Sequence, residues 1–580
     1  MPHDDAPATA ARGSFDRATA LRRLGEESFD VLVIGGGITG AGVALDAAAR
    51  GLRTAMVERH DFASGTSSKS SKMVHGGLRY LQQRDVRLVY EALHERQRLL
   101  ENAPHLVAPL PFLIPLFGRD GVVNKSVARA YAVALTLYDL TGGLRIGRRH
   151  RRVDAAEALA HLPTLRTDRL VAGFLYYDAR ADDARLTLCI ARTAALDHGA
   201  VVANYCEVEG LVTDASGSVQ GARVRPAVPP GGPAGDTLEV RAKVVVNATG
   251  VWADDVRALE QKSHPHSLRP AKGVHVTVPR AKLPADIAAV VPVAGDRRSI
   301  FVVPWSDGDD VYLGTTDTDW DGSLDDPACL PRDVDYLLSA ANHVITEPLE
   351  PHDVTGVWAG LRPLLAGGAG HEVSARTADL SRRHRVQESE HGLVTVTGGK
   401  LTTYRKMAED TVGVVVRRLG SQAPSGAHRC PTRRLPLRGA AGLEHLRRPG
   451  AAAAFGLDPD VFAALVGRHG GETPEVLELA SGRRDLLEPL VPGLPHLRVE
   501  ALWAVRQEMA MTTDDVLARR TRAALRRGGA AAATAPAVAD LLAPEWRRAP
   551  ADAARDAAAF AESVRRDLTR AGLDAVPSTP

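Results

Sequence analysis

The first strongly patterned part of the chain is a short apolar run followed by small residues at helical spacing. Residues 31–34 (VLVI) are continuously apolar, as in a strand that is buried on both faces. Small residues then continue into a helix, Gly51 ends that helix, and residues 53–58 (RTAMVE) form a second apolar run. The order of strand, helix and strand predicts a βαβ unit.

Further apolar runs of this kind appear later in the chain. Residues 243–247 (KVVVN) form a buried strand that ends in Ala-Thr-Gly, and residues 391–397 (HGLVTVT) form another, followed by Gly-Gly and a helix capped by Thr402 or Thr403. Residues 182–202 are interpreted as a helix that leads to an edge strand. These segments predict a nucleotide-binding sheet assembled from discontinuous parts of the chain.

A different periodicity occupies the middle of the chain. Residues 273–278 (GVHVTV), 300–305 (IFVVPW) and 311–316 (VYLGTT) are short segments with alternating character. Such alternation is typical of an antiparallel sheet, so we expect a substrate-binding sheet here.

From about residue 430 the chain becomes helical and loses its β-branched runs. Residues 430–525 are predicted to form a helical C-terminal domain, and residues 526–580 an Ala- and Arg-rich helical tail. Because the apolar content of the tail is mostly alanine, we expect it to pack weakly or to mediate assembly. The expected fold class is α/β (α+β overall), with a Rossmann-like domain in discontinuous segments, an antiparallel-sheet domain and helical C-terminal domain.

Composition limits the functional classes. The formal net charge of +2 over 580 residues gives no reason to expect nucleic-acid binding. Four cysteines lie far apart and form no CxxC pair, which fits a reducing compartment and predicts neither a disulfide framework nor a metal site. Residues 1–27 are polar and lack a signal region, and no run of about 18 apolar residues exists. We therefore expect a cytoplasmic protein, in which residues 106–117 and 128–140 are the only segments apolar enough to contact a membrane.

The turn after the first strand carries the strongest chemical signal. Gly35, Gly37 and Gly40 have the GxGxxG spacing, in which the glycines allow a tight turn, close approach of a pyrophosphate, and close packing of helix on strand. Glu58 ends the second strand, where a carboxylate can accept hydrogen bonds from the adenosine ribose. An acid at this position disfavours NADP, and NAD and FAD both remain.

Residues 69–81 (KSSKMVHGGLRYL) are too polar for a core and too rich in glycine for a good helix. Hydroxyls and backbone N–H groups in such a segment can wrap a long cofactor. A solvated serine-rich loop is the alternative interpretation.

Taken with other motifs, this segment resembles those of a known family, the FAD-dependent glycerol-3-phosphate dehydrogenases of the glycine/D-amino-acid-oxidase-like flavoprotein superfamily. The motifs that carry the resemblance run in family order from about residue 28 to residue 525. They are IGGGITGAGVALDAAARGL, TSSKSSKMVHGGLRYL, DDARLTL, NATGVWAD, KGVHVTV, FVVPWSDGDDVYLGTTDTDW, GVWAGLRPLL, TGGKLTTYRKMAED and EMAMTTDDVLARRTRAAL.

The resemblance implies FAD as the cofactor and glycerol 3-phosphate as the substrate. The cofactor-binding residues that it implies are Gly35, Gly36, Gly37, Ile38, Thr39, Gly40, Glu58, Thr66, Ser67, Ser70, Ser71, Lys72, His75, Gly76, Gly77, Val208, Ala248, Thr249, Gly250, Gly399, Lys400, Leu401, Thr402 and Thr403. The domain boundaries that we expect are 28–105, 166–270 and 355–415 for the FAD-binding domain, and 106–165 and 271–354 for the substrate domain.

A small phosphate monoester needs cationic partners, and the matching motifs contain several. The residues expected to bind substrate are Arg79, Tyr80, Arg362, Lys400 and Tyr404. The catalytic set is His275, Lys400, Arg362 and His75, in which the base is left open between the two histidines and Lys400. The family pattern leads us to expect a small polar residue where the chain has Val274, which affects the expected hydrogen bonding of its neighbour.

The expected reaction is oxidation of sn-glycerol 3-phosphate to dihydroxyacetone phosphate by hydride transfer to FAD, with electrons passed to a quinone. The resemblance implies peripheral contact with the inner face of the cell membrane, where that quinone resides, and a homo-oligomer is possible. The alternatives are a glycerol-3-phosphate oxidase that uses oxygen, an amino-acid or amine oxidase, and a non-catalytic scaffold that retains the fold.

Overall fold

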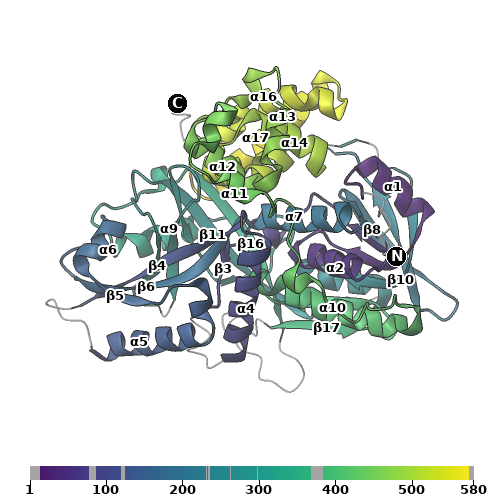
Figure 1. The fold of residues 1–580 in the computed structure, drawn as a ribbon, viewed down its shortest axis with the longest axis horizontal. Helices are drawn as coiled ribbons and strands as arrows, with labels where there is room; N and C mark the ends of the chain where they lie inside the picture. The colour runs from purple at the N-terminus through teal and green to yellow at the C-terminus, as the bar shows by residue number, and fades with distance from the viewer. Residues whose placement is uncertain are drawn as a thin grey trace, which may run out of the picture.

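The protein consists of two β-sheets and a helical body (Figure 1). The computed structural model describes residues 13–77, 86–118, 125–229, 231–232, 235–261, 263–296, 298–366 and 383–573. Arg79 and Tyr80 therefore lie outside the described residues. The expected fold class, a mixed α/β architecture with a helical C-terminal domain, is confirmed.

The first sheet contains the predicted βαβ unit. Its strand order is β17-β18-β10-β1-β2-β7. Outside this order, β9 pairs with β10, and β8 pairs with β9. The parallel pairings of β1 with β2 and β10 align Ile34 with Val57 and with Asn247, so these three strands end at the same edge. The bounds are β1 Ser28–Ile34, β2 Thr54–Val57, β7 Val201–Ala203, β8 Cys206–Thr213, β9 Val219–Pro226, β10 Leu238–Asn247, β17 His384–Glu388 and β18 Val394–Gly398.

Helices cover this sheet. On one face α2 (Ile38–Ala49) packs between α7 (Asp183–Leu196) and α10 (Tyr404–Leu419). On the other face lies α1 (Arg17–Glu26), whose Leu24 is fully buried. The expectation of a polar extension over residues 1–27 is therefore wrong for residues 17–26, because their apolar stripe packs on the sheet. Helix α8 (Ala253–Gln261) follows β10.

The second sheet is mostly antiparallel, as its alternating pattern predicts. Strand β11 pairs with β14 on one side and with β16 on the other. The remaining pairings are antiparallel except for β12 with β4. The bounds are β3 Met73–Val74, β4 Val107–Phe117, β5 Arg151–Asp154, β6 Leu170–Ala181, β11 Leu268–Pro279, β12 Ala288–Pro292, β13 Ser299–Pro304, β14 Asp310–Gly314, β15 Thr318–Asp319 and β16 Gly356–Leu365.

The observed sheets differ from the expected domain boundaries. Strands β3, β6 and β16 lie in segments assigned to the FAD-binding domain, yet they belong to the second sheet. The physical reason is strand pairing. Strand β6 pairs along its length with β4, and β16 pairs with β11, so backbone hydrogen bonds and shared burial hold both strands in the second sheet.

Helices also lie on both faces of the second sheet. Helices α4 (Val86–Asn102) and α5 (Lys125–Leu140) pack on one face through a cluster that includes Leu93, Tyr138 and Phe112, and Figure 1 shows them at its lower side. Helices α6 (Ala155–His161) and α9 (Pro331–Asn342) contribute to the core on the other face. Among the described helices, none is both long enough and apolar enough to cross a membrane.

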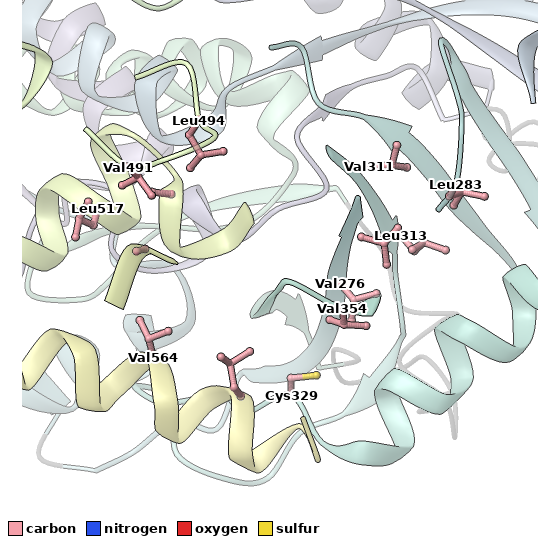
Figure 2. Packing of buried hydrophobic residues seen from close by; sticks show 14 of the residues in the cluster. Val276, Leu283, Val311, Leu313, Cys329, Val354, Val491, Leu494, Leu517 and Val564 are labelled. Atoms are coloured by element: carbon pink, nitrogen blue, oxygen red, sulfur yellow. The ribbon is translucent and has the colours of Figure 1, made fainter. Parts of the chain in front are cut away.

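The C-terminal region is helical from residue 443 onwards, as predicted. Its elements are α11 Leu443–Leu446, α12 Pro459–His469, α13 Thr473–Glu478, α14 Arg498–Glu508, the π-helical turn η12 Asp515–Arg520, α15 Ala523–Arg526, α16 Gly528–Trp546 and α17 Pro550–Arg570. Figure 2 shows Val564 of α17 in the same buried cluster as Val276 and Leu313 of the second sheet. The expectation of a weakly packed tail is wrong, because alanines allow α16 and α17 to approach closely while Phe560 and Leu568 fill the core.

Candidate active site

A cavity of about 640 Å³ runs from the carboxyl ends of β1, β2 and β10 to the wall formed by β11 and β16. It collects most of the predicted site residues from segments that are hundreds of positions apart. Those that line it are Gly35, Gly37, Ile38, Thr39, Glu58, Thr66, Ser67, Ser70, Ser71, His75, Gly77, Val208, Ala248, Thr249, Gly250, His275, Arg362, Gly399, Lys400, Leu401 and Thr402. Gly36, Gly40, Lys72, Gly76, Thr403 and Tyr404 do not line it.

At one end of the cavity the glycine turn has the geometry that a pyrophosphate requires. Gly35 has a φ of +108°, and a Cβ on Gly40 would lie 1.8 Å from the carbonyl oxygen of Gly35. Helix α2 begins at Ile38, whose N–H donates to the Ser67 hydroxyl at 2.9 Å. A helix N-terminus at the cavity wall provides partial positive charge for a bound phosphate group.

Glu58 lies at the end of β2 beside this turn. Its carboxylate accepts hydrogen bonds from the backbone N–H groups of Gly36 at 2.6 Å and of His60 at 2.9 Å. Burial raises the pKa of this carboxyl group, and the two N–H donors act in the opposite direction. The carboxylate is thus fixed at the cavity wall, where its remaining lone pairs can accept from ribose hydroxyls.

The segment from Thr66 to Gly77 connects the two sheets along the cavity. The Thr66 hydroxyl donates to the carbonyl oxygen of Leu361 at 2.6 Å. The backbone carbonyls of Ser70 and Ser71 accept hydrogen bonds from the Trp358 indole at 3.2 Å and the Tyr312 hydroxyl at 2.9 Å. This polar, glycine-rich segment is therefore held by side chains of the second sheet.

Lys72 differs from its predicted role as a cofactor contact. Its side chain is 4% exposed and turns away from the cavity, so that Nζ lies 3.1 Å from Asp183 and 5.0 Å from the centre of the Trp358 ring. Burial, followed by the charge of Arg522, lowers its pKa to about 8. Lys72 turns away from the cavity because a buried ammonium requires a carboxylate, and Asp183 provides it.

His275 lies on β11 at the cavity wall and is 2% exposed. Its Nε2 is 2.7 Å from the Ser71 hydroxyl, and its ring stacks on that of Trp358 with centroids 4.7 Å apart. The other nitrogen, Nδ1, has no hydrogen-bond partner among the residues that the structure describes. Burial, followed by nearby Lys72 and Arg362, holds the pKa of the imidazole well below its ordinary value, so the ring is neutral at pH 7.

Arg362 lies on the neighbouring strand β16. Its guanidinium donates to Asp317 at 3.1 Å and to the Thr315 hydroxyl at 3.2 Å. A Cβ at Gly273 would lie 2.6 Å from Nη2, so the absence of a side chain there makes room for the guanidinium. Arg362 is thereby held at the cavity wall, on the strand next to that of His275.

Lys400 follows a turn in which Gly398 and Gly399 have φ values of +74° and +82°. The Thr402 hydroxyl accepts a hydrogen bond from the His75 N–H at 3.2 Å and donates to the His75 carbonyl at 3.3 Å. Thr403 occupies the N-cap position of α10, as predicted, but its hydroxyl makes no capping hydrogen bond, and Thr402 joins the Lys400 turn to His75 instead.

Tyr404 does not reach the cavity. It is buried in the core of the first sheet, and its ring occupies the space where a Cβ of Gly42 would lie. The prediction that it binds substrate is therefore wrong, because the first turn of α10 directs it towards α2.

Val274 is fully buried, and its N–H donates to the hydroxyl of Thr316. The hydrogen-bond partner of the neighbouring His275 is the hydroxyl of Ser71.

Several residues that hold the cavity wall in place were not predicted. Asp183, Trp358 and Tyr312 hold the segment of Ser70 and Ser71, and Asp317 holds Arg362. Asp183 carried a signal, since it directly follows the capping acid Asp182 at the start of a helix of buried residues. A further apolar wall, here called the apolar lobe, consists of Phe112, Ile114, Tyr131, Tyr176, Val290 and Phe301.

These features together define the class of proteins that bind a dinucleotide cofactor beside reactive side chains. A dinucleotide turn, an imidazole, a guanidinium and an ammonium all line one cavity. The glycine cradle and the fixed Glu58 fit the pyrophosphate and ribose of FAD, and His275 and Lys400 line the same cavity, which would also hold its redox ring.

The comparisons with known families agree with this class. Residues 30–405 match the family model described as FAD dependent oxidoreductase, and residues 430–553 match the C-terminal domain of alpha-glycerophosphate oxidase. A solved structure of the glycerol-3-phosphate dehydrogenase from Bacillus halodurans, complexed with FAD, has a TM-score of 0.74 and 32% identity, and the match covers 97% of this chain and 99% of that chain.

Relatives of known name extend over most of the chain. Glycerol-3-phosphate dehydrogenase of Mycobacterium leprae is 42% identical over 96% of this chain and 92% of its own length. The mitochondrial glycerol-3-phosphate dehydrogenase of Homo sapiens is 38% identical over 91% of this chain and 72% of its own length. The chain belongs to the FAD-dependent oxidoreductase family, and within it to the glycerol-3-phosphate dehydrogenases. FAD is its cofactor.

Proposed function

We propose that the chain oxidises sn-glycerol 3-phosphate to dihydroxyacetone phosphate and passes the electrons to a quinone. The observation that carries this proposal is that two cationic side chains, Arg362 and Lys400, line one cavity together with the neutral imidazole of His275. Cations that face a shared cavity suit an anion better than a neutral amine, and the relatives that cover the chain are named for glycerol 3-phosphate.

Arg362 is proposed to bind the substrate phosphate. Its guanidinium is held in place by Asp317 and Thr315, so little side-chain freedom remains to be lost on binding. A planar guanidinium offers paired N–H donors to phosphate oxygens, and Lys400, which lines the same cavity, adds a point charge.

His275 is proposed to remove the hydroxyl proton of the substrate. The depressed pKa keeps the imidazole in its basic form at neutral pH, and Ser71 at 2.7 Å fixes the ring orientation. His75 also lines the cavity, and its backbone is held by Thr402. Lys400 is assigned to stabilise the developing oxyanion. FAD, when bound, supplies the acceptor for the hydride that leaves carbon 2.

The apolar lobe supports a quinone as the electron acceptor. Its aromatic rings lie close together, with centroids of Phe112 and Tyr176 5.1 Å apart and those of Phe112 and Phe301 6.1 Å apart. A wall of this kind suits a planar apolar ring, and Tyr131 places helix α5 beside it.

Peripheral membrane contact is proposed through the outer face of α5. Val133, Leu137 and Leu140 are 55%, 49% and 70% exposed and lie at helical spacing on one side of the helix. Exposed Arg145, Arg148 and Arg149 follow this helix and would favour anionic lipids.

Anaerobic mixing of the purified holoprotein with glycerol 3-phosphate tests the proposed reaction. We expect the flavin absorption near 450 nm to bleach with glycerol 3-phosphate and to persist with D-amino acids or amines. Bleaching by an amino acid alone would replace the proposal with the amino-acid oxidase alternative. Formation of hydrogen peroxide at the rate of substrate oxidation in air would assign oxygen, instead of quinone, as the acceptor.

A further inference from the structure

We infer that the C-terminal helical domain contributes a positioning residue to the active site: Arg522 holds residues 68–72 in place and, through Ser71, orients His275. The inference deepens the proposed function, since it assumes that His275 takes part in the reaction. Arg522 itself touches neither the cavity nor the proposed substrate.

Arg522 reaches from the C-terminal domain into the FAD-binding region. Its side chain is 2% exposed, and Nη2 binds the carboxylate of Asp183. Nη1 donates to the carbonyl oxygen of Ser68 at 3.3 Å, and Nε lies 3.2 Å from Asp182. One guanidinium therefore joins the start of helix α7 to the cofactor loop.

Asp183 connects Arg522 to the loop that lines the cavity. This fully buried carboxylate accepts hydrogen bonds from the backbone N–H of Ser70 at 3.0 Å and from its hydroxyl at 2.7 Å. The ammonium of Lys72 lies 3.1 Å away on the same carboxylate. Two cations share one buried anion, so removal of Arg522 takes away one of the groups that fix the position of the Asp183 carboxylate.

Ser71 lies between the two residues that Asp183 holds. Its hydroxyl is 2.7 Å from Nε2 of His275, while its carbonyl accepts from Tyr312. The direction of the Ser71 hydroxyl is therefore set by the anchoring of Ser70 and Lys72. A shift of this loop would change the orientation of the imidazole without removing any atom from the site.

Backbone strain supports a functional role for this arrangement. Lys72 and Arg522 both have positive φ values, +53° and +63°, although neither is glycine. Such conformations are unfavourable for residues with a side chain and persist where surrounding contacts impose them, often near active sites. Arg522 also follows the π-helical turn η12, another local irregularity that is frequent at functional sites.

The same turn also holds the other end of the cofactor loop. Arg519 and Arg520 bind Asp61, which lies three residues beyond the ribose-binding Glu58. Arg522 is distinguished from them by its contacts with Asp183 and Ser68, next to the residues that face His275. Arg522 therefore holds residues 68–72, which are the part of the loop next to His275.

The test compares Arg522→Gln with a matched control, Arg192→Gln. Arg192 also joins α7 to the C-terminal region, through Glu472 at 2.6 Å, but none of its hydrogen bonds and ion pairs within the described part of the chain involves residues 68–72. Hydrogen exchange of the holoprotein, read by mass spectrometry, should show amides 68–72 exchanging about tenfold faster in Arg522→Gln, because a charge-assisted hydrogen bond is lost. The control should leave these amides unchanged.

A second measurement separates positioning from general loosening. In stopped-flow reduction by glycerol 3-phosphate, Arg522→Gln should lower the limiting rate about tenfold while the apparent substrate Kd changes less than twofold. Asp183→Asn should reproduce both effects. If Arg522→Gln does not fold, Arg522→Lys, which keeps the charge but loses the fork, is measured in its place.

Unchanged exchange of amides 68–72 in a folded variant would overturn the inference, as would equal effects from Arg192→Gln. If the wild-type flavin is not reduced by glycerol 3-phosphate at all, the proposed reaction fails, while the exchange measurement still decides whether Arg522 holds the loop.

Discussion

At the scale of single residues, the site depends on side chains that are fixed before any ligand binds. His275 is held by Ser71 and Trp358, and Arg362 by Asp317 and Thr315. Such preorganisation lowers the cost of ordering on binding and makes the roles of the two residues separable by mutation.

Arg362→Ala should raise the substrate Kd about 100-fold and change the limiting rate of flavin reduction much less, because a phosphate contact is made equally in the ground and transition states. The measurement is anaerobic stopped-flow titration with glycerol 3-phosphate. Arg269→Ala, on the exposed part of β11 outside the cavity, is the control. An unchanged Kd would remove Arg362 from the phosphate site.

The pH dependence of flavin reduction follows from the environment of His275. Burial, Lys72 and Arg362 hold its pKa well below 6.5, against the opposing charge of Asp183. The base form therefore persists as the pH falls, and the limiting rate should decline only well below pH 6.5. An acid limb centred at pH 7 or above would contradict His275 as the base.

His275→Asn should lower the limiting rate of flavin reduction by about 100-fold or more and abolish the acid limb of its pH profile.

At the scale of elements, the loops of the site are held by strands of the other sheet. The segment 66–77 crosses from the first sheet to the second, and Trp358 and Tyr312 bind its backbone. Helix α5 has two different faces: its Tyr131 lines the apolar lobe, and its outer face is exposed and apolar.

Leu137→Glu with Leu140→Glu should reduce binding to vesicles that contain anionic lipid by at least tenfold, because two exposed apolar side chains would be replaced by charges. Cosedimentation measures the bound fraction. Val228→Glu, an exposed apolar residue elsewhere on the chain, is the control. If reduction of a water-soluble dye also fell, the double variant would have damaged the site rather than the contact surface.

At the scale of the whole molecule, the C-terminal helices and the second sheet share one core. Val564 and Phe560 of α17 belong to the same buried cluster as Val276 and Leu313 (Figure 2). Arg522 and its neighbours add ion pairs between the C-terminal region and the cofactor loop. The region called a tail from its alanine content is thus an integral part of the fold.

Phe560→Ala should lower the free energy of unfolding by about 3–5 kcal/mol, since it leaves a cavity in this shared core. Because the core is continuous, the second sheet and the C-terminal helices should unfold in one transition that moves to lower temperature. Differential scanning calorimetry measures this shift, with Glu562→Ala on the exposed face of α17 as the control. Two separated transitions would contradict a shared core.

The sequence alone determined the features that depend on local chemistry. The βαβ unit with its glycine turn, the acid at Glu58 and the alternating strands of the second sheet were predicted, because helical and strand periodicity and the conformational freedom of glycine are local properties. Most of the site residues that the family resemblance implied also line the cavity. Tertiary structure decided which sheet received β6 and β16, why Lys72 and Tyr404 turn away from the cavity, and how Arg522 reaches Asp183. Strand pairing and the partners of buried charges depend on residues hundreds of positions apart, and only the packed chain brings those partners together.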